Sequence, residues 1–490
     1  MAHRVTSLFP GVALAPVALA FTAISFAPLV HAGDAEQAEG ERPMLFGQPV
    51  NVPEELTPEE LEARAQAFHE GLERQGMVLH GTQVLPKDAL KPYIRDETHP
   101  VEAWDQPPHR TSIFLNFFGG PLKNGTNASE SESPCVQGNI DYPGYLAGEQ
   151  AALAIIQVFK DAAEPFGMRI LYEKVPPKHL PYSQVMMGGR PGVIGLPQGV
   201  LGVACNLDCG DSWWRDTTFA FTEETNQVSI LGTTALQEAA HAWGLDHIDG
   251  ANNIMYPYAT PGDKVWASTC TPYNDATGGI GCQPTHDKFC DGGAQNDVAE
   301  LMAYFGPNSV DSEAPTVKML SPTDGQMYTK GDTLHIEVEV DDNFLGFGWR
   351  LMVPELKQEQ PVYNGQTVWD LPVPPKGEYT IRVEALDHDG NIGFAEAKIY
   401  VDTVPSEGGD TGSSGDDSMT PTGSGDPSAS AGESGSAGAS EASEASDGND
   451  TLPGESGKDD GCSCRADAPM AASGWLFGLA GALLIRRRRR

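Results

Sequence analysis

Apolar and polar residues alternate at two different spacings along the chain, and the spacing distinguishes its regions. Between residues 106 and 308, apolar positions recur every three or four residues in three segments, which predicts helices over 146–163, from near Val228 to Trp243, and over 295–305. Apolar, β-rich runs between them predict strands. These runs cover 111–118, 168–173, 184–187 and 219–221. This region is therefore predicted to be a domain that mixes helices and strands.

Residues 313–402 follow a different pattern, with apolar and polar residues alternating one by one. The alternation is clearest over 334–340, 377–385 and 395–401. Short alternating strands separated by turn residues predict a β-sandwich. The region resembles the bacterial immunoglobulin-like modules that follow exported hydrolases. Residues 387–391, Asp-His-Asp-Gly-Asn, are interpreted as a hairpin turn, with calcium binding as the alternative.

The segment 33–105 is predicted to be a propeptide-like N-terminal extension. Thr57-Pro58-Glu59-Glu60 forms a capping box with proline in the first turn, and apolar residues then recur at helical spacing from Leu61 to Leu72. The segment has no cysteine, so a cysteine thiolate cannot serve to block a site elsewhere in the chain. The alternative is a simple extension without an inhibitory role.

The N-terminus and the cysteines indicate export. Residues 1–32 carry a basic residue, an apolar run from about Leu8 to Val30 and a small-x-Ala site, which is typical of a secretory signal. An uncleaved anchor is the alternative. An even number of cysteines in an exported domain predicts three disulfides, with a metal clip at Cys205 and Cys209 as the alternative. The six are Cys135, Cys205, Cys209, Cys270, Cys282 and Cys290.

The C-terminal part predicts a stalk and an anchor. Residues 403–460 are rich in Ser, Gly and acidic residues, with Lys458 as the single basic residue, and are predicted to be disordered. In 461–490, Cys462 and Cys464 precede an apolar stretch over about 468–485 and five arginines. The stretch is long enough for a transmembrane helix. This tail resembles the sorting tails of exported proteins in myxobacteria, which implies display at the cell surface or outer membrane; a plain tail anchor is the alternative.

The formal net charge of the 490-residue chain is −37, which argues against nucleic acid as a partner. The C-terminal segment instead predicts a membrane as a partner.

The residues that carry chemistry lie in 237–257. Glu238 and His241 belong to the predicted helix over 228–243, and positions 237 and 241 share one face because they are four residues apart. Gly244 can adopt the left-handed conformation that ends a helix, and the chain would then bring His247 back beside His241. Two imidazoles and a neighbouring carboxylate are the groups that hold a zinc ion and take a proton from its water.

The segment resembles the zinc helix and Met-turn of metzincin metallopeptidases, whose pattern is H-E-x-x-H-x-x-G-x-x-H followed by a methionine turn. Glu238, His241, Gly244, His247 and Met255 match, whereas Gln237 stands where the first histidine is expected. The residues around Met255 are similar to the Met-turn of matrix metalloproteinases. That likeness implies a substrate pocket lined by Tyr256, Pro257 and Tyr258.

The resemblance implies a fold and an activity. The expected fold class is an α+β metzincin-like catalytic domain, a twisted mixed sheet with an active-site helix, followed by an all-β immunoglobulin-like sandwich, a disordered acidic stalk and a C-terminal transmembrane helix. The expected activity is zinc-dependent peptide hydrolysis with one catalytic Zn²⁺ on His241 and His247 and with Glu238 as general base. Gln237 is a doubtful ligand, and His286 is a candidate replacement. The alternative is a pseudoprotease that binds protein or peptide without cutting it.

Overall fold

The computed structural model describes residues 42–53, 55–87, 108–206, 209, 215–276, 280–363 and 365–404. These residues belong to one compact unit. Three separate hydrophobic clusters lie within it. The predicted signal peptide, most of the predicted stalk, Cys462, Cys464 and the predicted transmembrane segment lie outside the described residues.

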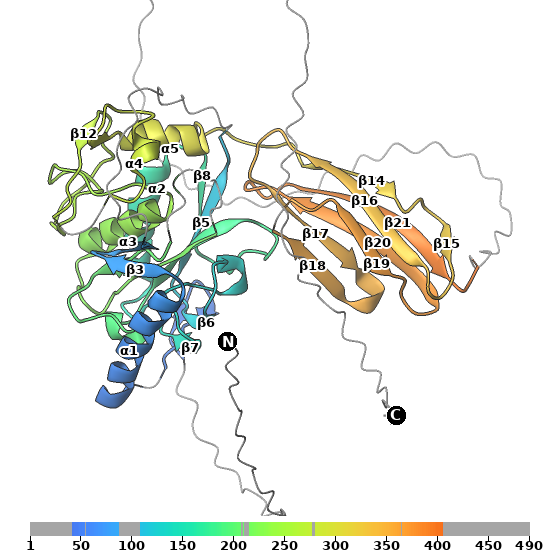
Figure 1. Cartoon of the computed structure of the whole chain (residues 1–490), viewed down its shortest axis with the longest axis horizontal. Coiled ribbons are helices and arrows are strands. Elements are labelled where there is room, and N and C mark those ends of the chain that lie inside the picture. The colour runs from blue at the N-terminus through green and yellow to red at the C-terminus, as the bar shows by residue number, and fades with distance from the viewer. Residues whose placement is uncertain are drawn as a thin grey trace, which may run out of the picture. The chain divides into compact units, whose positions relative to one another are not determined.

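A five-stranded sheet forms the centre of the first region (Figure 1). Its strand order is β10-β11-β9-β5-β8, and only β10 runs antiparallel to its neighbour. Every residue of β5 and β9 is buried, as expected where both faces of a parallel sheet are covered. The strands are β5 (Thr111–Asn116), β8 (Met168–Leu171), β9 (Tyr182–Met187), β10 (Gly202–Val203) and β11 (Thr217–Ala220).

Three helices accompany this sheet, and they begin and end close to the predicted positions. They are α2 (Glu149–Ala163), α3 (Val228–Ala242) and α5 (Asp297–Phe305). Helices α2 and α3 pack against each other, and the apolar side chains of all three helices join the strands in the largest hydrophobic cluster. Trp243, at the end of α3, is fully buried against Phe305 of α5. The core thus packs around α3, which positions the side chains of the candidate site.

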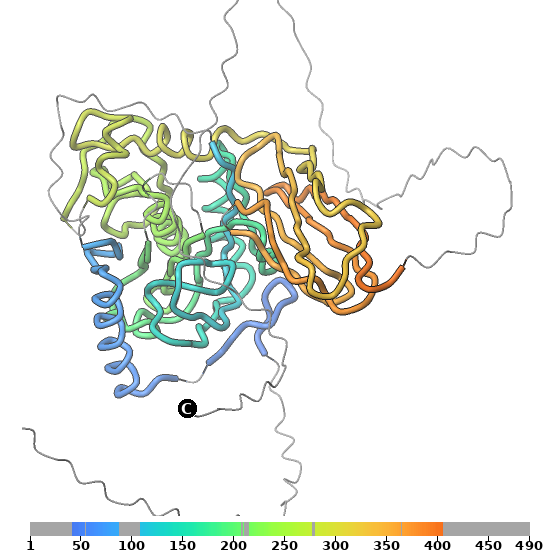
Figure 2. Tube along the Cα trace, turned by 45° about the vertical axis from the view of Figure 1, so that its right-hand side comes forward, coloured from blue at the N-terminus to red at the C-terminus, as the bar shows by residue number. Residues whose placement is uncertain are grey.

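The N-terminal segment packs against this region rather than standing apart from it. Helix α1 (Pro58–Arg74) begins with the predicted capping box, in which Thr57 and Glu60 each accept a hydrogen bond from the other's backbone N–H. Phe68 and Leu72 are buried in the second cluster. The segment also contains β1 (Met44–Leu45), β2 (Gln48–Pro49) and the hairpin of β3 (Met77–His80) and β4 (Gln83–Pro86). Figure 2 shows it in blue.

Shorter elements complete the first region. They are η1 (Ala128–Glu130), η2 (Pro191–Ile194), α4 (Gln283–His286), the pair β6 (Gly120–Lys123) and β7 (Asn139–Tyr142), and the pair β12 (Thr271–Pro272) and β13 (Ala294–Gln295).

The predicted β-sandwich is confirmed in the following region. One sheet has the order β14-β16-β19 and the other β15-β21-β20-β17-β18, and the third hydrophobic cluster is built from strands of both (Figure 1). Ile336 of β16 and Ile381 of β20 are completely buried in it. Its elements are β14 (Thr316–Ser321), β15 (Gln326–Tyr328), β16 (Thr333–Asp341), β17 (Gly348–Val353), η3 (Pro354–Leu356), β18 (Gln358–Val362), β19 (Val368–Pro372), β20 (Gly377–Leu386) and β21 (Ile392–Val401).

The three predicted disulfides are confirmed. The pairs are Cys135–Cys205, Cys209–Cys282 and Cys270–Cys290. Cys205 and Cys209 bond to different partners, so they do not form a metal clip. Because disulfides form and persist in oxidising compartments, the protein is an extracellular or surface protein.

The predicted fold class, an α+β metzincin-like domain followed by a sandwich, a stalk and a transmembrane helix, is wrong. Strands greatly outnumber helices among the described residues, so this part of the chain is mostly β. The resemblance rested on 21 residues, whose spacing fixes one helix and two turns but not the secondary structure of the rest. No helix within the described ranges is long and apolar enough to cross a membrane.

Candidate metal and peptide-binding site

The end of α3 brings two histidines together. Gly244 has φ +103°, in the left-handed region, and its N–H donates to the His241 carbonyl at 2.9 Å. The chain turns there, and the Nε2 atoms of His241 and His247 lie 3.1 Å apart with their rings nearly perpendicular. The motif's spacing thus produces the expected approach of these two side chains.

Both imidazoles are buried and neutral near neutral pH. Burial lowers the pKa of His241 to about 4. Burial and the neighbouring His241 lower the pKa of His247 to about 3. Nδ1 of His241 lies 2.6 Å from the carbonyl oxygen of Leu245, and an N–H donated to that oxygen leaves the Nε2 lone pair directed towards His247. The pair therefore presents nitrogen donors rather than positive charge.

Glu238 lies on the same helix and faces a cavity. Its side chain is 1% exposed, and Oε2 has no hydrogen-bond partner among the described residues. Burial raises its pKa well above the usual range, and a hydrogen bond from the Ala204 backbone offsets part of the rise. Gly202 of β10 permits this approach, since a Cβ there would lie 2.6 Å from Glu238 Cγ. A buried carboxyl with an oxygen to spare is suited to accept and return a proton.

Gln237 is anchored to the methionine turn. Its Nε2 donates to the carbonyls of Ile254 at 3.1 Å and Tyr256 at 2.9 Å. Because both partners can only accept, the amide nitrogen must face them, and the amide oxygen is directed away from the turn. Gln237 therefore ties α3 to the 254–256 segment, and only its neutral oxygen is left to act as a ligand.

The predicted pocket residues line one cavity. Tyr256, Pro257 and Tyr258 border a space of about 350 Å³ together with Gln237 and Glu238. Met255 is fully buried beneath, and its carbonyl accepts a hydrogen bond from Ile248 at 3.0 Å. Neither His241 nor His247 is among the residues that line this cavity. The two histidines are therefore buried and do not themselves border the cavity, whereas Glu238 does.

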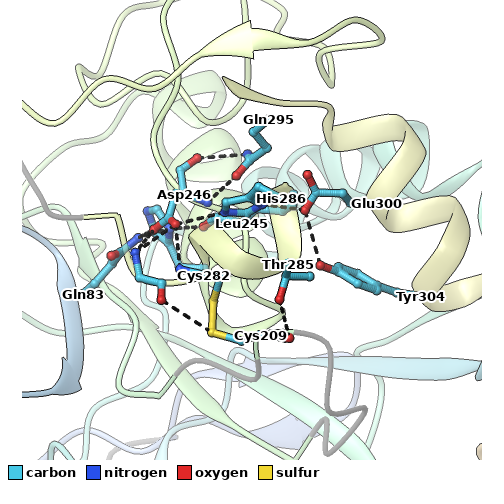
Figure 3. Close-up of a disulfide and its surroundings, with 12 residues drawn as sticks. Gln83, Cys209, Leu245, Asp246, Cys282, Thr285, His286, Gln295, Glu300 and Tyr304 are labelled. Atoms are coloured by element: carbon cyan, nitrogen blue, oxygen red, sulfur yellow. Dashed lines mark hydrogen bonds and ion pairs between the residues drawn. A yellow bond between two sulfur atoms is a disulfide. The ribbon is translucent and has the colours of Figure 1, made fainter. Parts of the chain in front are cut away.

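A buried network beside the histidines was not foreseen from the sequence. Asp246, which is completely buried, accepts hydrogen bonds from the backbone N–H groups of Gly281 and Cys282 and lies 3.0 Å from Nε2 of His286 (Figure 3). The other ring nitrogen of His286 lies 2.7 Å from Glu300. Both nitrogens of His286 are therefore engaged by carboxylates, and the prediction that it supplies a replacement metal ligand is wrong.

The N-terminal hairpin reaches this site. Nε2 of Gln83, a fully buried residue of β4, lies 2.6 Å from Nδ1 of His241 and 3.2 Å from Oδ1 of Asp246. Its neighbours bond to Ala204, beyond β10: Val84 N–H donates to the Ala204 carbonyl and Ala204 N–H donates to the Thr82 carbonyl. The hairpin thus occupies the edge of the sheet next to Glu238.

Comparisons with known proteins give only partial matches. No family model and no curated protein matches the sequence. Solved structures that match include fibronectin(III)-like modules of Clostridium thermocellum CbhA, at 19% identity over 20% of this chain and 52% of that chain, with a TM-score of 0.16. The PKD domain of human KIAA0319 matches at 14% identity over 23% of this chain and 99% of that chain, with a TM-score of 0.15.

A third structure, wild-type OgpA from Akkermansia muciniphila, matches a longer part of the chain. The identity is 12% over 64% of this chain and 96% of that chain, with a TM-score of 0.16. Thus this chain spans about half of the CbhA modules and nearly all of the other two. At these TM-scores the matches define no family and support no activity, so function must be argued from the site itself.

Proposed function

We propose that this protein is a zinc-dependent endopeptidase in which His241 and His247 hold the ion and Glu238 is the general base. The observation that carries the proposal is the 3.1 Å approach of the two imidazole Nε2 atoms beside an unpartnered Glu238 oxygen. Two neutral nitrogens approach this closely only when a proton or a cation lies between them. Two nitrogens bound to one tetrahedral zinc ion, each at about 2.0–2.1 Å, are about 3.3 Å apart, so the pair fits zinc.

The zinc ligands, Glu238 and the cavity residues each have a separate role in the proposed reaction. Bound zinc would polarise a peptide carbonyl and lower the pKa of its water to about 7. Oε2 of Glu238, at the cavity wall, accepts the proton of the attacking water and passes it to the leaving amide nitrogen. The cavity beside Tyr256 and Tyr258 receives the substrate residue next to the bond that is cut. The Nδ1–H bond to Leu245 keeps His241 in the tautomer that leaves Nε2 as a donor.

The same proposal gives the N-terminal hairpin an inhibitory role. An extended substrate would add to the sheet at its edge strand, β10, and the segment from Thr82 to Val84 already bonds to Ala204 there. Thr82 also lines the cavity. The conformation in which the hairpin bonds to Ala204 is therefore the latent form, and activity requires the hairpin to dissociate from the sheet edge. This role does not depend on a cysteine.

The test is casein cleavage by the purified chain before and after the hairpin is released through a protease site introduced between residues 87 and 108. We expect release to raise the rate and Glu238→Gln to lower it by about 10²-fold or more. The matched control is Glu223→Gln, which alters a surface carboxylate near Arg190 and should leave the rate unchanged. A released chain that cleaves nothing, or a Glu238→Gln variant as active as its parent, would refute the proposal.

Gln237 supports a second candidate, a pseudoprotease that binds protein or peptide without cutting it. Its amide nitrogen is held by two carbonyls, and an amide oxygen is a weaker zinc ligand than imidazole nitrogen. Under this alternative the released wild-type chain binds peptide but contains no zinc, whereas Gln237→His acquires the ion. Zinc and cleavage in the wild type would exclude it.

A further inference from the structure

Three aspartates from separate parts of the sequence meet at one end of the sandwich. Asp311 lies in the segment between α5 and β14, Asp342 directly follows β16, and Asp387 directly follows β20. One carboxylate oxygen from each lies within 4.8 Å of the other two. Oxygens that bind one calcium ion at 2.3–2.6 Å are separated by at most about 4.6–5.2 Å, so this spacing suits a shared ion.

Two of the carboxylates belong to buried residues, Asp342 is half-buried, and several of their oxygens lack a hydrogen-bond partner within the described residues. Asp311 is 6% exposed and Asp387 is 4% exposed. Oδ2 of Asp311 and both oxygens of Asp342 are inaccessible to solvent and have no hydrogen-bond partner among the described residues. Buried polar atoms are nearly always paired, and an unpaired group calls for an explanation such as an ion. The cluster therefore differs from an acidic surface patch, whose oxygens are hydrated.

The three carboxylates are compensated only in part, because Arg110 attracts Asp311 and Asp387 electrostatically but forms its ion pair with Asp389. No salt bridge within the described residues involves Asp311, Asp342 or Asp387. The nearby guanidinium groups of Arg110 and Arg169 pair instead with Asp389, the second residue after Asp387. Like charges held together in a buried position destabilise a fold unless a cation offsets them.

The remaining contacts organise the three side chains. Oδ1 of Asp311 accepts from Asn343 Nδ2 and from Glu313 N–H, both at 3.0 Å. Both oxygens of Asp387 accept from Asn391, one from its backbone N–H and one from its side chain, at 2.8 Å. Asn391 also donates to the carbonyl of Asp311. The carboxylates are thus oriented before any ion arrives.

The raised pKa of Asp342 agrees with this picture. Burial, with a further contribution from Asp311 and Asp387, raises its pKa to about 6. The backbone N–H groups of Asn343 and Phe344 offset part of this rise, although neither meets hydrogen-bond geometry with Asp342.

We propose that Asp311, Asp342 and Asp387 form a calcium site that fastens the segment before β14 to the sandwich. Calcium suits the site because it takes oxygen ligands in irregular geometry and is available outside the cell, where the three disulfides place this protein. Magnesium demands nearly ideal octahedral geometry, which three carboxylates from separate loops do not readily provide. The site is independent of His241 and His247.

The test is calorimetric titration of the metal-stripped full-length chain with CaCl₂, and separately with MgCl₂. We expect one calcium per chain with a dissociation constant of about 10⁻⁴–10⁻³ M, as in other extracellular modules, and much weaker magnesium binding. Asp342→Asn should weaken calcium binding by at least about tenfold. Asp341→Asn, which neutralises the adjacent exposed side chain, should bind calcium as the wild type does.

Thermal unfolding distinguishes a variant that has lost the calcium site from one that has failed to fold. Calcium should raise the melting temperature of the wild type and of Asp341→Asn but not that of Asp342→Asn. Without calcium, Asp342→Asn should melt at or above the wild type, because the substitution removes repulsion between carboxylates. Absence of calcium binding by the wild type, equal binding by Asp342→Asn, or magnesium binding as tight as calcium binding would each overturn the proposal.

Discussion

The buried triad of Asp246, His286 and Glu300 predicts an unusual alkaline loss of stability. All three side chains are fully buried, and His286 lies between two carboxylates at 3.0 and 2.7 Å (Figure 3). Burial alone would lower the pKa of His286, but the charge of Glu300 and the hydrogen bonds to Asp246 and Glu300 outweigh it and raise the pKa to about 10. His286 is therefore a cation at neutral pH, whereas the buried His241 and His247 are neutral.

The size of the effect follows from linkage. The folded pKa of about 10 lies above the ordinary value of 6.5, so protonated His286 stabilises the folded state. That stabilisation is fully present below about pH 6.5 and is lost as the pH rises through about 10. A difference of about 3.5 units, at about 1.36 kcal/mol per unit, gives an upper bound of about 5 kcal/mol. Removing one partner of a buried ion pair typically costs about 3–5 kcal/mol, which is consistent with this upper bound.

The perturbation is His286→Gln, and the assay is urea unfolding followed by tryptophan fluorescence between pH 6.5 and 10.5. We expect the variant to be less stable than the wild type by about 3–5 kcal/mol at pH 7, and we expect most of that difference to disappear by pH 10.5. Tyr304→Phe is the control, because it removes a 3.3 Å bond to Glu300 without removing the cation. Burial raises the pKa of Tyr304 well above its usual range, so the cost of Tyr304→Phe, about 1 kcal/mol, should be constant up to about pH 9 and should shrink above it, where tyrosine ionises in the unfolded chain.

Parallel stability curves for the wild type and His286→Gln would refute the reasoning. They would mean that His286 is neutral in the folded protein and that the two carboxylates are satisfied in some other way. A cost for Tyr304→Phe that changes with pH below about pH 9 would show instead that alkaline unfolding begins elsewhere in the molecule.

Two further predictions concern the candidate site. Gly244→Ala should destabilise the protein by about 1–3 kcal/mol in thermal unfolding and displace His247, because φ is +103° and the new Cβ would lie 3.0 Å from the Cys209 backbone; a substitution without cost would contradict the left-handed turn. Gln83→Ala should loosen the β3–β4 hairpin, because it removes the hydrogen bond from Gln83 Nε2 to Oδ1 of Asp246 at 3.2 Å. We expect hydrogen exchange over 77–86 to be faster by about tenfold, for a loss of about 1.4 kcal/mol, and unchanged exchange would show that Gln83 does not hold the hairpin.

The local parts of the site were predictable because they are encoded by short spacings. The positions of Glu238 and His241 on a helix, the turn at Gly244 and the burial of Met255 all depend on residues fewer than twenty apart. The cysteine count predicted three disulfides but not their pairing, because Cys135–Cys205 and Cys209–Cys282 close loops of 70 and 73 residues. Such pairing is decided by the fold as a whole.

The missed features depend on contacts between distant segments. Gln83 meets His241 across 158 residues and Asp246 meets His286 across 40, and neither pair has a periodicity that a sequence pattern reveals. The β content was underestimated for a related reason. Strands such as β10 and β12 have two residues each, too few for alternation to be recognised. The motif therefore weighed more heavily in the predicted fold class than its 21 residues justified.

Zinc content tests the central claim most directly. The chain would be purified without chelators and with zinc supplied, and the metal would be measured by mass spectrometry beside the double variant His241→Ala, His247→Ala and the surface control His335→Ala. The account predicts about one zinc per wild-type and control chain and none in the double variant. A wild-type chain without zinc, or a double variant that retains it, would contradict the assignment of His241 and His247 as metal ligands.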